Sequence, residues 1–375
     1  SQDLLDDFKR ADKVCDGDID KWIKFANTLR LRIAMQLVKV YPDSQKEAED
    51  AVRDGVLTNS DSDVVLKSGL MLFRIEDLWN DTRANANIIS ILQGYSDPRL
   101  ERWFATNNAD IYSTDDELSP VVEKATKYLG VRQGVPMTRT EYQGYSKTSR
   151  VGIPEQGPRP VLRVAEAYFL RAEGMLRNWN MGDGTPESLY NEGIHSAWAS
   201  VLGDESGWAG TYESYINGFI NTEEGGDFDW ELFEGGFGSA PYINYRNQEY
   251  NYYIEENGKQ VGINRISVRW HDEDSPEKKL QRIITQKWIS FFPTLSSVAW
   301  TEYRRTGYPK LIPIPSDLNY SNGAIDTELQ IRRLPFTQSE YRGNTEEVNK
   351  ALGLLKGPDN GGTRLWWDVD KGNFE

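Results

Sequence analysis

Two neighbouring stretches decide the fold: PVLRVAEAYFLRAEGML at residues 160–176 and TPESLYNEGIHSAWASVLG at residues 185–203. In each stretch apolar and small residues recur in steps of three and four, the spacing of one face of an α-helix. They are Leu162, Ala165, Phe169, Ala172 and Leu176 in the first stretch, and Leu189, Tyr190, Gly193, Ile194, Ala197, Trp198 and Val201 in the second. Thr185, Pro186 and Glu187 supply a cap, a first-turn proline and an acidic residue at the positive end of the second helix. Two such helices joined by a short loop predict an αα-hairpin, packed closely through its small residues as in tetratricopeptide-type repeats.

A longer helix is predicted before this hairpin, over residues 20–41. Asp18 or Asp20 is expected to cap it, and Pro42 is expected to stop it. One continuous apolar stripe runs along it. The basic residues outside that stripe are Lys21, Lys24, Arg30, Arg32 and Lys39. We interpret them as a solvated basic face rather than a binding site.

The same spacing predicts shorter helices elsewhere in the chain. They cover residues 44–56, 87–93, 275–292, 294–305 and 345–354. Thr294 is expected to cap the helix that ends at Arg304 and Arg305, and Gly307 to close it. We expect the two arginines to hold the terminal segment through hydrogen bonds, although a doubled arginine is also suited to bind an anion.

Two long segments lack helical spacing. Residues 106–159 are rich in Gly, Pro, Ser and Thr, and residues 207–270 are rich in Gly and aromatic residues. Long irregular segments in a compact domain are often functional. We therefore expect these two insertions to face the ligand.

A β-hairpin is predicted within the second insertion. The runs at residues 250–254 and 261–266 flank Asn257-Gly258, and Asn-Gly between such runs is the strongest short-range hairpin signal. We therefore predict a mainly α single domain over residues 1–375. In it, tetratricopeptide-like helical pairs pack against an irregular, loop-rich half with a small β-hairpin.

The amino-acid composition argues against several classes of partner and of binding site. The chain carries 43 basic and 58 acidic residues, a net charge of −15. This balance argues against nucleic acid and anionic membranes as main partners. Cys15 is the only cysteine, so no internal disulfide can form, and two histidines make a structural zinc site improbable. The longest uncharged apolar stretch, residues 288–300, is too short to span a bilayer.

Aromatic residues are the informative excess, with 12 Trp, 19 Tyr and 13 Phe. A pyranose presents an apolar face that stacks on flat rings and a polar rim that needs hydrogen-bond partners. Aromatic residues in loops with polar neighbours are therefore candidates for sugar binding, with simple packing as the alternative role. The candidates are Trp79 with Asn80 and Arg83, Trp208 with Tyr212, and Trp230 near Asp227 and Asp229.

Acidic clusters offer other chemistry. Asp227 and Asp229, or the acidic residues at 272–274, have the composition of a glycosidase acid and base. Calcium is a candidate ligand at residues 16–20 or 223–234, because hard cations prefer oxygen ligands. Neither segment has EF-hand spacing, and solvated acidic loops are the simpler interpretation. We therefore expect no cofactor, with calcium as an open alternative.

Six short segments, in this order, carry a family resemblance. They are KWIKFANTLRLR at 21–32, DPR at 97–99, AEAYFLRAE at 165–173, QKW at 286–288, WTEYRRTGYP at 300–309 and RRLP at 332–335. Each is weak alone, but together they resemble the SusD/RagB family, the surface glycan-binding lipoproteins of Bacteroidetes. By this resemblance, we expect the sequence to start partway into the family pattern, without its first helical stretch.

The resemblance implies a mostly helical fold with tetratricopeptide-like pairs and a non-enzymatic role. It implies that the protein captures oligo- or polysaccharide at the cell outer membrane and delivers it to a SusC-like TonB-dependent transporter. The family's lipid-carrying cysteine lies at the mature N-terminus, and Cys15 does not match it. A lipid anchor would then belong to an N-terminal segment outside this sequence.

Two other functions remain open. An α-helical toroid glycoside hydrolase is also acidic and Trp-rich, and it would need two converging carboxylates across an aromatic cleft. A protein-interaction scaffold built on helical repeats would instead present a broad apolar groove along its helix pairs.

Overall fold

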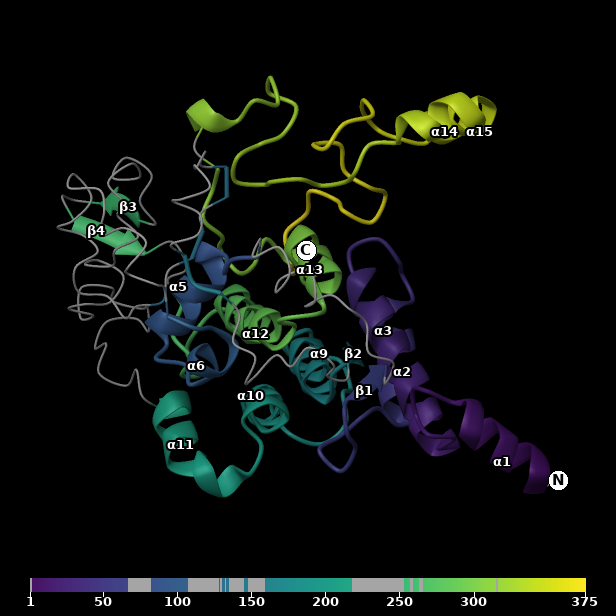
Figure 1. Ribbon diagram of the computed structural model, residues 1–375, viewed down its shortest axis with the longest axis vertical. Coiled ribbons are helices and arrows are strands. Elements are labelled where there is room, and N and C mark those ends of the chain that lie inside the picture. Colours follow the sequence, from purple (N-terminus) through teal and green to yellow (C-terminus); the bar gives the residue numbers. More distant parts are fainter. Residues whose placement is uncertain are drawn as a thin grey trace.

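The computed structural model of the chain describes residues 2–66, 82–106, 128, 130–131, 133–134, 145–147, 159–217, 253–256, 259–262, 266–314 and 316–375. Its longer helices are α1 (Gln2–Ala11), α2 (Ile19–Gln36), α3 (Ser44–Arg53), α5 (Ala86–Gly94), α6 (Arg99–Trp103), α9 (Val164–Leu176), α10 (Pro186–Leu202), α11 (Ala209–Asn217), α12 (Pro276–Ser290), α13 (Ser296–Thr306), α14 (Gln338–Gly343) and α15 (Thr345–Leu352). The strands are β1 (Val64–Leu66), β2 (Arg159–Leu162), β3 (Tyr253–Glu256) and β4 (Lys259–Gly262). The predicted mainly α fold is confirmed. Helices α9, α10 and α12 lie at the centre, with α2 and α3 to one side and α5 and α6 to the other (Figure 1).

The predicted αα-hairpin is formed by α9 and α10. Thr185 accepts a hydrogen bond from the backbone N–H of Ser188, and the Ser188 hydroxyl accepts one from the Thr185 N–H, so the two form a capping box. Gly193 permits the close approach of the two helices, because a Cβ at this position would lie 2.6 Å from a ring carbon of Phe169. The tetratricopeptide-like packing therefore depends on a small residue at this contact.

The first helix of the hairpin begins later than predicted. Leu162 belongs to β2, which pairs antiparallel with β1, and α9 starts only at Val164. The reason is a long-range contact: the carboxylate of Asp63 accepts hydrogen bonds from the Val164 N–H (2.8 Å) and from the guanidinium of Arg163 (3.0 Å). Asp63 thus supplies the helix cap from 101 positions away in the sequence.

Helix α2 is shorter than predicted. Asp18 caps it as expected, accepting from the Lys21 N–H, but the helix ends at Gln36 and the chain continues as turns. This turn brings the Lys39 ammonium to the carbonyl oxygens of Arg305 and Lys371, each at 2.8 Å. The expected solvated basic face is therefore wrong for Lys39, and also for Arg32, whose guanidinium pairs with a fully buried carboxylate.

Other boundaries also differ from the sequence prediction. Helix α1 was not predicted, and α11 lies inside the segment expected to be an irregular insertion. Leu295, not Thr294, occupies the N-cap position of α13, because the Thr294 hydroxyl is directed at the carbonyl of Pro160, 3.5 Å away. Gly307 closes α13 in the left-handed conformation as predicted. Strands β3 and β4 form the predicted antiparallel hairpin.

Buried charges join the central helices. Arg32 of α2 pairs with Glu166 of α9, and Lys287 of α12 lies 3.3 Å from a carboxylate oxygen of Glu302 of α13. Arg305 of α13 binds both Glu302 and Glu173 of α9. Such a network leaves little freedom to shift one helix against another without separating buried charges. The orientation of α13 is thereby fixed.

Among the helices that the structure describes, none is long and apolar enough to cross a membrane.

Candidate functional site

A cavity of about 440 Å³ opens beside the corner between α12 and α13. Helix α5 and the residues just before it form the facing wall. The cavity is lined by Thr82, Arg83, Ala84, Asn85, Asn87, Ile88, Phe104, Gln133, Trp288, Phe291, Phe292, Pro293, Ser296, Ala299, Trp300, Tyr303, Leu311 and Gln330. Its size and its mixture of aromatic and amide side chains are typical of a small-molecule site.

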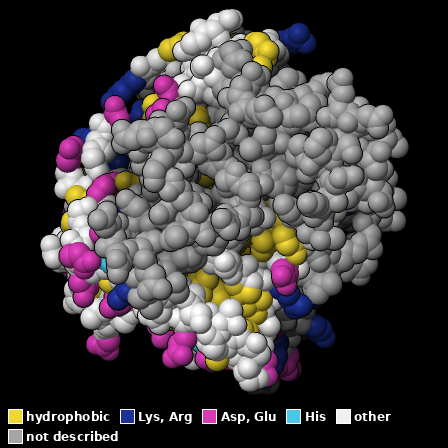
Figure 2. All heavy atoms as spheres, turned by 90° about the vertical axis from the view of Figure 1, so that its left-hand side faces the viewer, with side chains coloured by type: hydrophobic (Ala, Val, Ile, Leu, Met, Phe, Trp, Pro, Cys, Tyr) yellow, Lys and Arg dark blue, Asp and Glu magenta, His cyan; other side chains and the backbone are white. Residues whose placement is uncertain are grey.

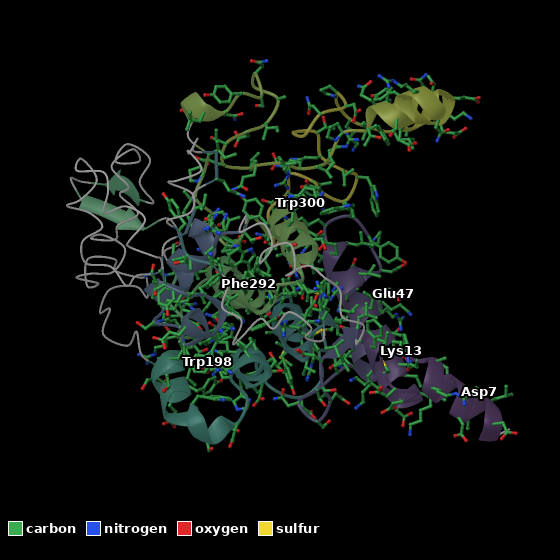
Figure 3. The ribbon with its side chains drawn as sticks, viewed as in Figure 1. Asp7, Lys13, Glu47, Trp198, Phe292 and Trp300 are labelled. Atoms are coloured by element: carbon green, nitrogen blue, oxygen red, sulfur yellow. The ribbon has the colours of Figure 1, made fainter. Side chains whose placement is uncertain are left out.

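The aromatic wall comes from two consecutive helices. Trp288 and Phe291 lie at the end of α12, and Ser296, Trp300 and Tyr303 are spaced so that they share one face of α13. Phe292 and Trp300, both labelled in Figure 3, also line the cavity. The turn between the helices therefore concentrates aromatic side chains at one place.

A hydrogen bond and a cation–π contact hold the side chain of Trp300 in place. Its indole N–H donates to the carbonyl of Ile331 at 2.8 Å, and the guanidinium of Arg304 lies 3.8 Å from its ring centroid. Arg304 also lies 4.5 Å from the ring of Trp367, so its guanidinium is sandwiched between two indoles. Burial lowers the pKa of Arg304 to about 10, which leaves it charged at neutral pH. The ring of Trp300 is thus held in a fixed orientation at the cavity wall.

The polar residues of the wall are mostly engaged in shaping it. The side chain of Asn85 caps α5 by accepting from the Asn87 N–H, and Asn87 accepts from the Ile312 N–H at 2.7 Å. The Tyr303 hydroxyl donates to the Glu328 carbonyl, and burial raises its pKa to about 12, so it stays a neutral phenol. Arg83 donates to the carbonyl of Thr82 at 2.8 Å. A ligand here would meet stacking surfaces edged by amide and hydroxyl groups.

Acidic groups are not part of the wall that the structure describes: the described lining residues include neither Asp nor Glu. The paired carboxylates required by the glycoside hydrolase alternative therefore find no support in the described part of this cavity. Likewise, within the described ranges no group of three or more His, Cys, Asp or Glu side chains is arranged to hold a metal ion. Just before and within the 16–20 segment, the carboxylate of Asp12 accepts hydrogen bonds from the backbone N–H groups of Val14, Cys15 and Gly17. The other candidate calcium segment, 223–234, lies outside the described residues.

Comparison with known proteins assigns the chain to a family. A sequence model described as "SusD-like: Susd and RagB outer membrane lipoprotein" matches residues 2–213 and 237–368. The chain belongs to the SusD-like family.

Solved structures agree with this assignment. A chitin-binding SusD homolog from Flavobacterium johnsoniae is 37% identical, with a TM-score of 0.78 over 98% of this chain and 67% of that one. SusD homologs from Bacteroides ovatus and Bacteroides vulgatus are each 32% identical with a TM-score of 0.75; the matches cover 98% and 99% of this chain and 71% and 69% of theirs. A search of curated proteins found no match.

The structure brings one of the predicted ligand residues to the cavity. Arg83 lines it and is 9% exposed. Its predicted companions Trp79 and Asn80, and the separate candidate Trp230, lie outside the described residues.

Trp208 and Tyr212 lie together but elsewhere, their ring centroids 5.8 Å apart at the α10–α11 end. Both rings pack on Trp198 and His195, and Trp208 is 6% exposed. In the view of Figure 3, Trp198 lies below Phe292, and Trp300 lies above it. In this structure the pair forms part of the packing between α10 and α11.

The aromatic wall itself was not predicted from the sequence. Trp288, Phe291 and Trp300 fit helical stripes, which are typical of a core, and Tyr303 falls within a family motif. The available signal was Pro293, which interrupts an aromatic-rich stretch and forces a corner between two helices. Arg304 donates to the Arg332 carbonyl at 2.6 Å, which confirms its expected tie to the terminal segment. Arg305 instead points into the helical core.

Proposed function

We propose that this SusD-like protein is a non-catalytic glycan-binding protein. The aromatic wall of the cavity carries the proposal: Trp300, fixed by the Arg304 stack, offers a rigid face to the apolar side of a pyranose. A rigid aromatic surface loses little entropy on binding, so modest contacts suffice for recognition. Hydrophobic side chains also gather on the face shown in Figure 2, with acidic side chains along its edge.

The ligand that we propose to test first is a chitin oligosaccharide. The Flavobacterium johnsoniae relative, 37% identical, is described as chitin-binding. Each N-acetylglucosamine unit adds an apolar methyl and an amide to the sugar ring. A wall of indole rings with asparagine side chains at its edge has matching chemistry.

We further propose that the bound glycan is passed to a SusC-like TonB-dependent transporter at the cell surface. The family description as outer membrane lipoproteins supports this placement. Attachment would use a lipid carried by an N-terminal segment outside this sequence. Calcium, and the remaining candidates Trp79, Asn80 and Trp230, stay part of the proposal as contributors to the ligand surface.

Calorimetry tests the proposal directly. Chitin oligosaccharides and a panel of plant, host and microbial polysaccharides are titrated into the protein, and each incubation is analysed for new reducing ends. We expect binding without released products. Trp300→Ala should weaken the affinity by about tenfold or more, since it removes a stacking ring. Tyr41→Ala, an exposed aromatic on the α2–α3 side, is the matched control and should bind normally.

Released oligosaccharides would contradict the non-catalytic role and favour a glycoside hydrolase. Absence of binding across the whole panel would contradict glycan capture itself. An equal loss of glycan affinity in Trp300→Ala and Tyr41→Ala would show that the cavity is not the binding site.

A further inference from the structure

Two segments of the C-terminal half run beside each other at the edge of the cavity. The Arg332 N–H donates to the Gly361 carbonyl at 2.7 Å, and the Arg332 guanidinium binds the buried carboxylate of Asp368, with one contact at 2.8 Å. Residues 329–334 and 361–368 are therefore held together as one surface.

This surface is continuous with the cavity. Gln330 lines the cavity, and its neighbours Leu329 and Ile331 are both exposed apolar residues. The Ile331 carbonyl holds the indole of Trp300. The stack continues from Trp300 through Arg304 to Trp367, the residue that follows Trp366.

Trp366 is the most conspicuous residue of this surface, because its large side chain is 67% exposed. The segment that carries it is not free to bury the ring elsewhere: Asp368, two residues on, is pinned by Arg332 and Arg364. Leu334, on the adjoining segment, is also exposed. Arg364 and Asp370, an ion pair at 3.2 Å, supply donors and acceptors close to Trp366 in the sequence.

We propose that Trp366 is a second stacking platform for long glycans. The part of a glycan that extends out of the cavity would cross the 329–334 segment and stack on the Trp366 ring. This inference rests on the proposed function and deepens it, since it makes the protein selective for polymers over short oligosaccharides. Linking two weak contacts on one polymer raises the overall affinity, because the second contact forms at a high effective concentration. Short ligands that fill only the cavity gain nothing from Trp366.

The test is a length series of chitin oligosaccharides, from disaccharide to polymer, titrated into wild type, Trp366→Ala and Leu354→Ala. Leu354 is 84% exposed and follows α15, so it is a matched exposed apolar control. We expect Trp366→Ala to weaken binding of the longest chains by about five- to tenfold and to leave the shortest binding ligand unchanged. Trp366→Phe, which keeps a ring, should retain most of the affinity, and thermal melting checks that all variants are folded.

The other results that the variants can give count against the platform. Equal affinities of wild type and Trp366→Ala at every length would overturn it. Equal weakening at every length would place Trp366 in the cavity's own binding rather than on a separate platform. Unchanged glycan affinity with loss of capture by a transporter protein would assign Trp366 to a protein interface. If wild type binds no chitin oligosaccharide but binds another glycan from the panel, the same series is run on that glycan. If it binds none, the proposed function fails together with the platform.

Discussion

Arg305 and Glu173 lie 132 positions apart in the sequence and form a fully buried bidentate ion pair, with N–O distances of 2.6 and 2.7 Å. Arg305 also binds Glu302 at 2.6 Å, and Glu173 also binds Arg177 at 2.8 Å. The pair joins α13 to α9. Because α13 also carries Trp300 to the cavity, the buried charges fix the position of the aromatic wall relative to the helical repeat.

Removing one partner of this pair should be strongly destabilising. We expect Arg305→Met to lower the free energy of unfolding by about 3–5 kcal/mol, because Glu173 and Glu302 would be left buried with too little positive charge. Urea unfolding at neutral pH measures the loss. Arg53→Met is the control: the Arg53 side chain is 67% exposed where it pairs with Asp50, so its loss should cost far less stability than the loss of Arg305. Equal effects of the two substitutions would contradict a structural role for the buried pair.

The same pair predicts a stability that depends on acid pH. Burial by itself would raise the pKa of Glu173, but the guanidinium groups of Arg305 and Arg177 outweigh it and lower the pKa from 4.5 to about 2. The ionised carboxylate therefore stabilises the folded state fully above about pH 4.5, and this contribution is lost as the pH falls towards 2. Urea unfolding of wild type and Glu173→Gln from pH 7 to pH 3 should show the stability difference shrinking below about pH 4.5. A difference that stays constant over this range would refute the assignment.

Close packing of α9 on α10 should make Gly193 intolerant of a side chain. Alanine is the better helix former by about 1 kcal/mol, yet its Cβ would overlap the Phe169 ring. We expect Gly193→Ala to destabilise the protein by about 1–3 kcal/mol through overpacking. Gly210→Ala in α11 is the matched control, because a Cβ there meets nothing within 4 Å. It should be neutral or slightly stabilising, and thermal melting separates the two results.

The stack behind Trp300 should require arginine specifically. Arg304→Lys keeps the positive charge but loses the planar guanidinium between Trp300 and Trp367, as well as the fork that reaches the Arg332 carbonyl. We expect glycan affinity to fall by about three- to tenfold as the Trp300 ring loosens, with the fold retained. Titration of the variant measures the affinity, and Arg10→Lys in the exposed α1 is the control. Unchanged affinity would show that the stack does not position the ring.

Much of the helical framework could be predicted from the sequence. The αα-hairpin, the Thr185 and Asp18 caps, the Gly307 terminus and the β-hairpin were all predicted. Caps and turns depend on residues within three or four positions, so a short stretch of sequence contains all the partners that matter.

Three of the errors have one physical cause in common, a partner from a distant part of the chain. Asp63 sets the start of α9, Pro160 draws the Thr294 hydroxyl away from α13, and Glu166 buries the guanidinium of Arg32. None of these contacts leaves a local signal.

The helix pairs, their caps and the family resemblance could therefore be predicted from the sequence alone, because these follow from periodicity and from short motifs in order. Which aromatic residues face a cavity is apparent only in the folded structure. Trp208 lies just before α11 and Trp300 lies in α13, yet one packs against Trp198 and the other lines the cavity. The difference lies in which surfaces meet when the helices pack, and that depends on buried charges such as Arg305 and Glu173, brought together only by folding.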